Sequence, residues 1–106
     1  MRMMMKVSIP VENGNDAARK GVLGSTIQKI LESVKPEAAY FAEDNGLRTG
    51  YIFFEMTESS QIPAMAEPWF LAFNATVTLR PAMNAQDLEK AGPSIDRVVK
   101  TFGATA

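Results

Sequence analysis

The stretch AAYFAEDNGLRTGYIFFEM, residues 38–56, decides the fold, because it holds two strand-like runs joined by a tight-turn signal. Aromatic and aliphatic residues in 38–43 and 48–56 favour β-structure, and Asn45-Gly46 between them readily adopts the positive φ angles of a type I′ turn. A two-residue loop fixes the strand register, since a slip of one residue turns every side chain to the opposite face. The stretch therefore predicts an antiparallel hairpin. Its expected facing pairs are Glu43 with Arg48, Phe41 with Gly50, and Tyr40 with Tyr51.

The flanking segments supply two more strands and several helices. A first strand is expected over 3–9, where Met5, Val7 and Ile9 share one face. Residues 12–16 are rich in turn formers and predict a loop, and an apolar stripe predicts a helix over 16–34. Gly21 and Gly24 weaken its first half, and Ser25 with Gln28 resembles a capping box, so a start of the stable helix at Ser25 is the alternative.

A second helical region follows Glu58-Ser59-Ser60, with Ile62, Met65, Ala66, Trp69 and Phe73 on one face. Pro68 should divide it into two short helices, because proline removes an internal hydrogen bond. The remaining expected elements are a strand over 75–79, a short helix opened by Asn84 with Asp87, and a last amphipathic helix that carries Ile95, Val98, Val99 and Phe102 and ends at Gly103.

The resulting order, β-α-β-β-α-β with a C-terminal helical tail, is that of a ferredoxin-like α+β domain. Right-handed crossovers give the antiparallel sheet the strand order 4-1-3-2, with strands numbered along the chain, and place both main helices on one face. No linker, repeat or low-complexity segment interrupts residues 1–106. We therefore expect a single domain.

The sheet face without helices has a composition suited to pairing with another sheet. A solvated face should be mostly polar, but here aromatic side chains alternate with charged ones. Such a mixture fits a sheet that packs on the sheet of a second copy around a semi-polar cavity, related by two-fold symmetry. We therefore predict a homodimer through this face. The residues predicted to line the pocket or the interface are Lys6, Ser8, Tyr40, Tyr51, Phe53, Glu55, Thr78 and Arg80.

Composition excludes several classes of function. The 106 residues include 11 Lys and Arg against 12 Asp and Glu, without a basic run, so no nucleic-acid footprint is expected. Apolar stretches are too short for a membrane span, and we expect a cytoplasmic protein. The chain has no cysteine and no histidine, which removes thiolate chemistry, Ser-His-Asp triads and histidine-bound metals. No metal or cofactor is predicted.

Four short runs carry a family resemblance: PEAAYF at 36–41, YIFFEM at 51–56, AEPWF at 66–70 and RPAMN at 80–84. With the element order and the length, they resemble the dimeric α/β-barrel superfamily, and more narrowly a small uncharacterised bacterial family within it. The resemblance implies two sheets closing into a barrel across a dimer. The superfamily includes monooxygenases, lactone isomerases and haem-degrading enzymes. Several of these enzymes rely on histidine, which this chain lacks.

Lys6, Glu55 and Arg80 are the charged residues on the predicted face, and they are the strongest candidates for chemistry or ligand binding. In a 4-1-3-2 sheet, Glu55 and Arg80 flank the start of the first strand, so their long side chains can meet over Met4 or Lys6. One interpretation is a charged pocket wall for an anionic or carbonyl-bearing ligand, with Glu55 as a candidate catalytic base. The other is a structural ion pair at the dimer interface, which sets register without adding much stability.

Aromatic residues allow the same two interpretations. Hydroxyls of Tyr40 and Tyr51 can orient a ligand, or the rings can simply pack at the interface. Trp69 and Phe73 can roof a pocket between helix and sheet, or they can pack in the core at helical spacing.

Two hypotheses for function therefore stay open. The first is small-molecule binding, or a cofactor-free enzyme, with a pocket on the sheet face. The second is a non-enzymatic homodimerisation or regulatory module without a ligand, in which the polar residues satisfy one another.

Overall fold

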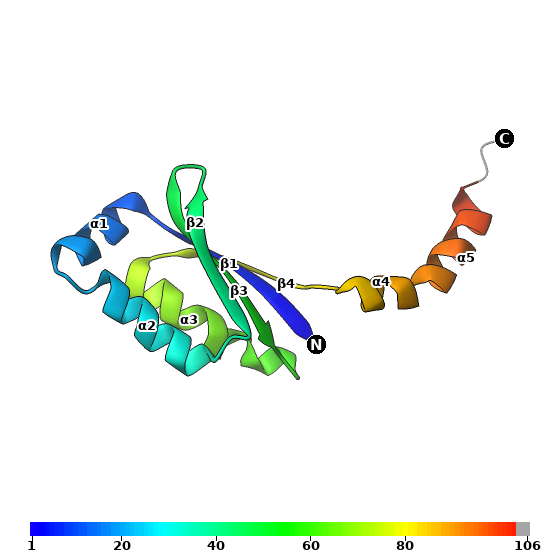
Figure 1. Ribbon diagram of the computed structural model, residues 1–106, viewed down its shortest axis with the longest axis horizontal. Coiled ribbons are helices and arrows are strands. Elements are labelled where there is room, and N and C mark those ends of the chain that lie inside the picture. The colour runs from blue at the N-terminus through cyan, green and yellow to red at the C-terminus, as the bar shows by residue number, and fades with distance from the viewer. Residues whose placement is uncertain (104–106) are drawn as a thin grey trace.

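A computed structural model describes residues 1–103 of the chain and shows an α+β arrangement with an antiparallel sheet (Figure 1). The strands are β1 (Arg2–Ile9), β2 (Ala38–Asp44), β3 (Leu47–Glu55) and β4 (Thr76–Pro81). The helices are α1 (Val11–Arg19), α2 (Leu23–Val34), the 3₁₀ turn η1 (Ser59–Gln61), α3 (Ile62–Phe73), α4 (Ala85–Lys90) and α5 (Gly92–Phe102).

The sheet has the predicted topology, because its order β2-β3-β1-β4 is 4-1-3-2 listed from the other edge. β1 lies in the middle and runs antiparallel to both β3 and β4. The hairpin prediction is confirmed as well, since Asn45 has φ 54° and Gly46 has φ 76°. All three expected facing pairs of the hairpin form.

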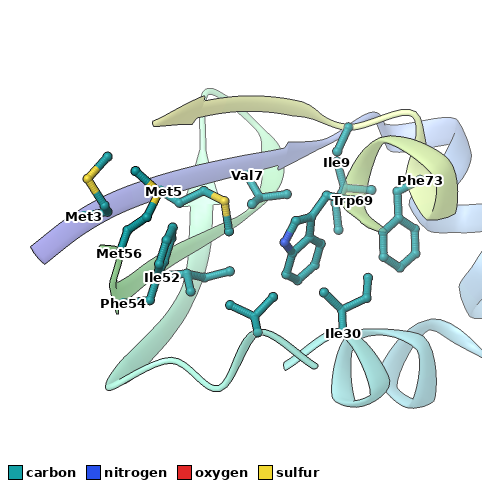
Figure 2. Packing of buried hydrophobic residues seen from close by; sticks show 12 residues of the cluster. Met3, Met5, Val7, Ile9, Ile30, Ile52, Phe54, Met56, Trp69 and Phe73 are labelled. Atoms are coloured by element: carbon teal, nitrogen blue, oxygen red, sulfur yellow. The ribbon is translucent and has the colours of Figure 1, made fainter. Parts of the chain in front are cut away.

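The hydrophobic core lies between the sheet and one layer of helices. Every second residue of β1 is buried, as alternation along a strand predicts. Helices α2 and α3 cover these residues, with Ile30 from α2 and with Trp69 and Phe73 from α3 (Figure 2). The rings of Trp69 and Phe73 stack with their centroids 6.4 Å apart. At one end of the core Met3, Met5 and Met56 are buried together with Phe54. Both main helices therefore lie on one face, and the other sheet face is left open.

The predicted loop at 12–16 is wrong, because these residues form most of α1. Gly14 donates its amide to the Pro10 carbonyl over 3.0 Å, so the helix begins directly after the proline. Tertiary contacts outweigh the weak helix propensity of this segment. Ala17 packs against the core, and Arg48 of β3 donates to the side-chain oxygen of Asn15 over 3.1 Å.

The single helix predicted over 16–34 is also wrong, because the chain breaks into α1 and α2. Gly21 interrupts it with φ 72°, a conformation that costs other residues steric strain. The amides of Gly21 and Val22 donate to the Ala18 and Ala17 carbonyls and so close the end of α1. Lys35, also at positive φ, then ends α2 before Pro36, as expected.

Pro68 does not divide the second helical region, which corrects the expectation of two short helices. α3 runs continuously past it. Buried side chains lie on both sides of the proline, with Ala66 before it and Trp69 and Phe73 after it. Their burial outweighs the one hydrogen bond that the Ala64 carbonyl loses, and Ala64 is exposed, where water can satisfy that carbonyl.

The C-terminal tail leaves the end of β4 as two short helices, α4 and α5, which extend away from the sheet (Figure 1). Asn84 and Asp87 open α4, as expected, and form a capping box: the Asn84 side chain accepts from the Asp87 amide over 2.8 Å, and the Asp87 side chain accepts from the Asn84 amide over 3.0 Å.

Candidate functional site

The open sheet face carries the residues that the sequence placed there. Facing residues of neighbouring strands project to the same side of a sheet. Lys6 of β1 faces Tyr51 of β3 and Thr78 of β4, and Tyr51 in turn faces Tyr40 of β2. One step along the sheet, Met4 lies between Phe53 and Arg80. A step in the other direction, Ser8 lies between Thr49 and Thr76.

A three-residue polar cluster occupies the middle of this face. The Nζ atom of Lys6 lies 2.9 Å from Oδ2 of Asp44, and the hydroxyl of Tyr51 donates to the same oxygen. Lys6 and Asp44 are both partly shielded from solvent, with about a third of each side chain exposed. Asp44 is the last residue of β2, so the hairpin places its carboxylate across β3 toward β1. The cluster therefore ties three of the four strands together on the open face.

The cluster holds its groups in fixed ionisation states. Hydrogen bonds from Tyr51 and from Lys6 lower the pKa of the Asp44 carboxyl. The hydrogen bond to Asp44 raises the pKa of the Lys6 ammonium, although the nearby positive charge of Arg80 opposes this. The hydrogen bond to Asp44 likewise raises the pKa of the Tyr51 hydroxyl. At neutral pH the cluster is therefore an ammonium, a carboxylate and a neutral phenol.

A shallow depression of 190 Å³ lies beside the cluster, lined by Met4, Lys6, Tyr51, Thr78 and Arg80. Of these, Arg80 and Thr78 come from the edge strand β4 and are exposed. Within residues 1–103 no salt bridge or side-chain hydrogen bond involves the Arg80 guanidinium. The depression therefore contains two positive charges. Asp44 balances the charge of Lys6, and the charge of Arg80 is available to a ligand.

Glu55 does not join Lys6 and Arg80. It faces Arg2 at the far end of β1, four residues from Lys6, which is about 13 Å along a strand. Its carboxylate pairs with the Met1 ammonium, and it lines a separate hollow together with Met83 and Asp87. The structure thus brings together two of the three charged residues that the sequence grouped.

The other predicted residues are distributed over both faces. Tyr40 lies on the open face, with 66% of its surface exposed. Phe53 and Ser8 lie on the same face and are half-buried. Trp69 and Phe73 are fully buried in the core on the opposite, helix-covered side (Figure 2). Those two residues pack the fold and do not line the depression.

Sequence reasoning missed Asp44, because the turn signal at Asn45-Gly46 placed it in a loop. The strand extends one residue further, and the alternation of β2 then puts Asp44 on the same side as Tyr40. The register that the sequence already predicted would have been sufficient to find it.

A larger cleft, also missed, lies on the helix-covered side between the hairpin tip and helices α1 and α2. Its volume is 570 Å³ and its lining is mainly apolar, with Ile9, Val11, Ile27, Phe41 and Leu47. Arg48 stands at its rim, directly against buried Gly14 of α1, where a side-chain Cβ would come within 2.5 Å of the guanidinium. The proximity of Gly14 to Arg48 depends on tertiary packing that no local pattern reveals.

Across residues 1–103, no group of three or more acidic side chains is placed to hold a metal ion. None of the helices in that range is both long and apolar enough to cross a membrane.

Comparison with known proteins adds no assignment. No protein-family model matches the chain, and a search of curated proteins finds no significant match. The functional argument therefore rests on the geometry of the chain itself.

Proposed function

We propose that this protein binds a small anionic or carbonyl-bearing molecule on its open sheet face. The observation that carries the proposal is the Arg80 guanidinium, which has no carboxylate partner in residues 1–103 and borders a depression beside a preformed polar cluster. A guanidinium offers several donors in a fixed plane that matches carboxylate and phosphate oxygens. Lys6 adds an ammonium group, which has three N–H donors although Asp44 balances its charge, and Thr78 adds a hydroxyl.

The polar cluster favours binding over acid–base catalysis. A lysine acts as a nucleophile or base only when its pKa is lowered, whereas Asp44 raises that of Lys6. Tyr51 already donates its proton to Asp44, and its pKa is raised as well. Glu55, the candidate base, lies outside the depression. These residues therefore orient a ligand and complement its charge.

The same proposal places two copies of the chain face to face, in the manner of the dimeric α/β barrels that the sequence resembles. Exposed Tyr40 and half-buried Phe53 support it, because aromatic residues on an open sheet face are typical of an interface. A second sheet would roof the shallow depression and turn it into an enclosed site of the kind that small ligands require.

A module without a ligand is the competing function, and the satisfied Lys6–Asp44–Tyr51 cluster favours it. Such groups can serve only to hold the hairpin against β1. Arg80 distinguishes the two functions, because a purely structural cluster gives its guanidinium no role.

Calorimetric titration tests the proposal with acetate, pyruvate and inorganic phosphate as probes. We expect at least one probe to bind, and Arg80→Gln to weaken that binding by about tenfold or more, as expected for the loss of a charge-assisted hydrogen bond. Arg19→Gln is the matched control, because it removes the same charge from the exposed end of α1 and should leave binding unchanged. The proposal is wrong if none of the probes binds, or if both variants weaken binding equally.

A further inference from the structure

The C-terminal arm, residues 82–102, has an apolar stripe that no other part of residues 1–103 covers. Ile95, Val98, Val99 and Phe102 recur at positions i, i+3, i+4 and i+7 of α5, which is the spacing of one helix face. Leu88 of α4 precedes Ile95 by seven residues. All five side chains are exposed, Phe102 to 80%, and neither α4 nor α5 contains a buried residue.

Isolated helices of this length are marginal in water, and most helices in proteins are stabilised by packing of their apolar face. α5 has 11 residues and α4 has 6. Their caps help, but they do not bury the stripe. The arm therefore requires a surface to pack on.

The dimensions of the chain show how far the arm stands from its own domain. The radius of gyration is 18.0 Å, whereas a compact chain of this length has about 13 Å. The longest dimension of the chain is 62 Å and the other two are 30 and 21 Å. Figure 1 shows α4 and α5 continuing outward from the end of β4, beyond the sheet and its helices.

Surface area points to a second copy of the chain as the partner. The chain exposes 7387 Å², roughly 1,500 Å² more than a compact monomer of its mass. A standard protein interface buries about 800 Å² per partner, and obligate homodimers bury more. The excess is therefore of the size that a stable homodimer hides. If the two copies exchange arms reciprocally, the same contact forms twice by two-fold symmetry, and the excess surface of each copy is buried.

The cleft between the hairpin tip and helices α1 and α2 is the matching surface. It is lined mainly by apolar residues, including half-exposed Val11 and Phe41. An amphipathic helix in an apolar groove is a recurrent mode of recognition. Within one chain, the arm and the cleft lie at opposite ends of β1. The arm begins beyond Pro81, which faces Met3, whereas the cleft is lined by Ile9, about 20 Å further along β1.

Charge does not oppose this pairing. Glu43 and Arg48 both line the cleft and face each other across the hairpin, so their charges balance. The charged residues of α5, Asp96, Arg97 and Lys100, lie outside its apolar stripe. We propose that the arm is exchanged between two copies, with the stripe of α5 from each copy seated in the apolar cleft of the other. This inference goes beyond the proposed function and does not depend on a ligand.

The mass of the full chain in solution tests the exchange. We expect twice the chain mass by light scattering, and Val98→Asp, which places a charge in the stripe, should make the dimer dissociate at a higher protein concentration than the parent dimer does. Thr101→Asp is the matched control, since it puts the same residue on α5 outside the stripe and should leave the dimer intact. A monomeric parent chain, or a dimer that Val98→Asp does not weaken, overturns the proposal.

Cross-linking separates exchange from an arm that folds back on its own domain. The chain has no cysteine, so single cysteines can be introduced cleanly. After Val98→Cys and Val11→Cys proteins are mixed, a short bismaleimide should join one copy to the other. Thr101→Cys mixed with Val11→Cys should give little product. Absence of the cross-chain product, or efficient linkage only within a chain that carries both cysteines, overturns the exchange. Neither result bears on anion binding at Arg80. A dimer that Val98→Asp does not weaken overturns the exchange but leaves pairing through the open sheet face standing.

Discussion

At the scale of single residues, Asp44 has more consequences than any other side chain on the open face. One of its oxygens accepts from both Lys6 and Tyr51, so the end of β2 is fixed over β1 and β3. The carboxylate also decides the charge of the neighbouring depression. With Asp44 ionised, Lys6 is neutralised and Arg80 supplies the available positive charge.

Asp44→Asn should change how stability depends on pH. Because its partners lower the pKa of Asp44 in the folded chain, this group stabilises the fold above its unfolded pKa of about 3.9. That stabilisation is lost as pH falls through the lower folded pKa. The variant should therefore unfold at lower urea than the parent near pH 6, and the difference should shrink toward about pH 2.

Glu32→Gln is the control for this comparison, because its exposed carboxylate on α2 has no ion-pair partner in residues 1–103. Its urea midpoint should follow that of the parent chain at every pH. A gap between Asp44→Asn and the parent that stays constant from neutral to acid pH would contradict the assignment.

Trp69 gives a second prediction at this scale. It is fully buried, and its Nε1 is the buried side-chain atom that lacks a hydrogen-bond partner among residues 1–103. Trp69→Ala should cost about 3–5 kcal/mol through the cavity it leaves. Trp69→Phe should cost only about 1–2 kcal/mol, because it also removes an unsatisfied donor. Urea unfolding followed by far-ultraviolet circular dichroism measures both, and equal costs would show that Nε1 is satisfied in solution.

At the scale of elements, the break between α1 and α2 was the main error of the sequence prediction. Polar residues at 12–16 indicate a loop, and the apolar stripe indicates one helix that begins at residue 16, whereas α2 begins at Leu23. The structure shows helix in both places and a turn at Gly21 between them. Local propensity could not predict this, because Arg48 and the core hold α1 from outside its own segment.

Two glycine variants test the break, and they should have opposite effects. Gly21→Ala places a side chain at φ 72° and should destabilise the fold by about 1–2 kcal/mol. Gly24→Ala lies within α2 with nothing near its Cβ position, and it should stabilise by about 0.5 kcal/mol. Urea midpoints of the two variants give the signs. A stabilising Gly21→Ala would mean that the two helices join in solution.

Other elements followed directly from the sequence. Asn45-Gly46 predicted the hairpin and its register, and that register in turn predicted which side chains share the open face. The prediction at Pro68 failed because a proline inside a helix costs about 3 kcal/mol, whereas the buried side chains of Trp69 and Phe73 contribute about 3–5 kcal/mol each. A proline therefore predicts the end of a helix reliably only where the side chains on both sides of it are not buried in the core.

At the scale of the whole molecule, the sequence predicted the sheet and its topology but not the position of the arm. Ile95 and Phe102 lie on an amphipathic stripe, and such a stripe normally packs on its own domain. Their exposure depends on the direction in which the chain leaves β4, which no residue pattern encodes. The same limit explains the missed cleft, since α1 and the hairpin tip meet only in the folded chain.

Amide hydrogen exchange gives a prediction for the whole chain. If arms are exchanged between copies, the amides of α4 and α5 should become more protected as protein concentration rises, because association buries them. Amides in the middle of β1 should remain protected at every concentration, since they lie at the centre of the sheet. If the protection of the arm amides does not depend on protein concentration, the arm does not pack on a second copy of the chain.

The methionines of the core connect this architecture to oxidative damage. Met1 and Met83 are largely exposed, whereas Met3, Met5 and Met56 are buried. Peroxide should therefore convert the first two to sulfoxides while the fold persists. A sulfoxide on any of the other three would place a polar group in the core, and it can form only when the sheet opens. The rate at which those three sulfurs oxidise therefore measures how often the domain opens.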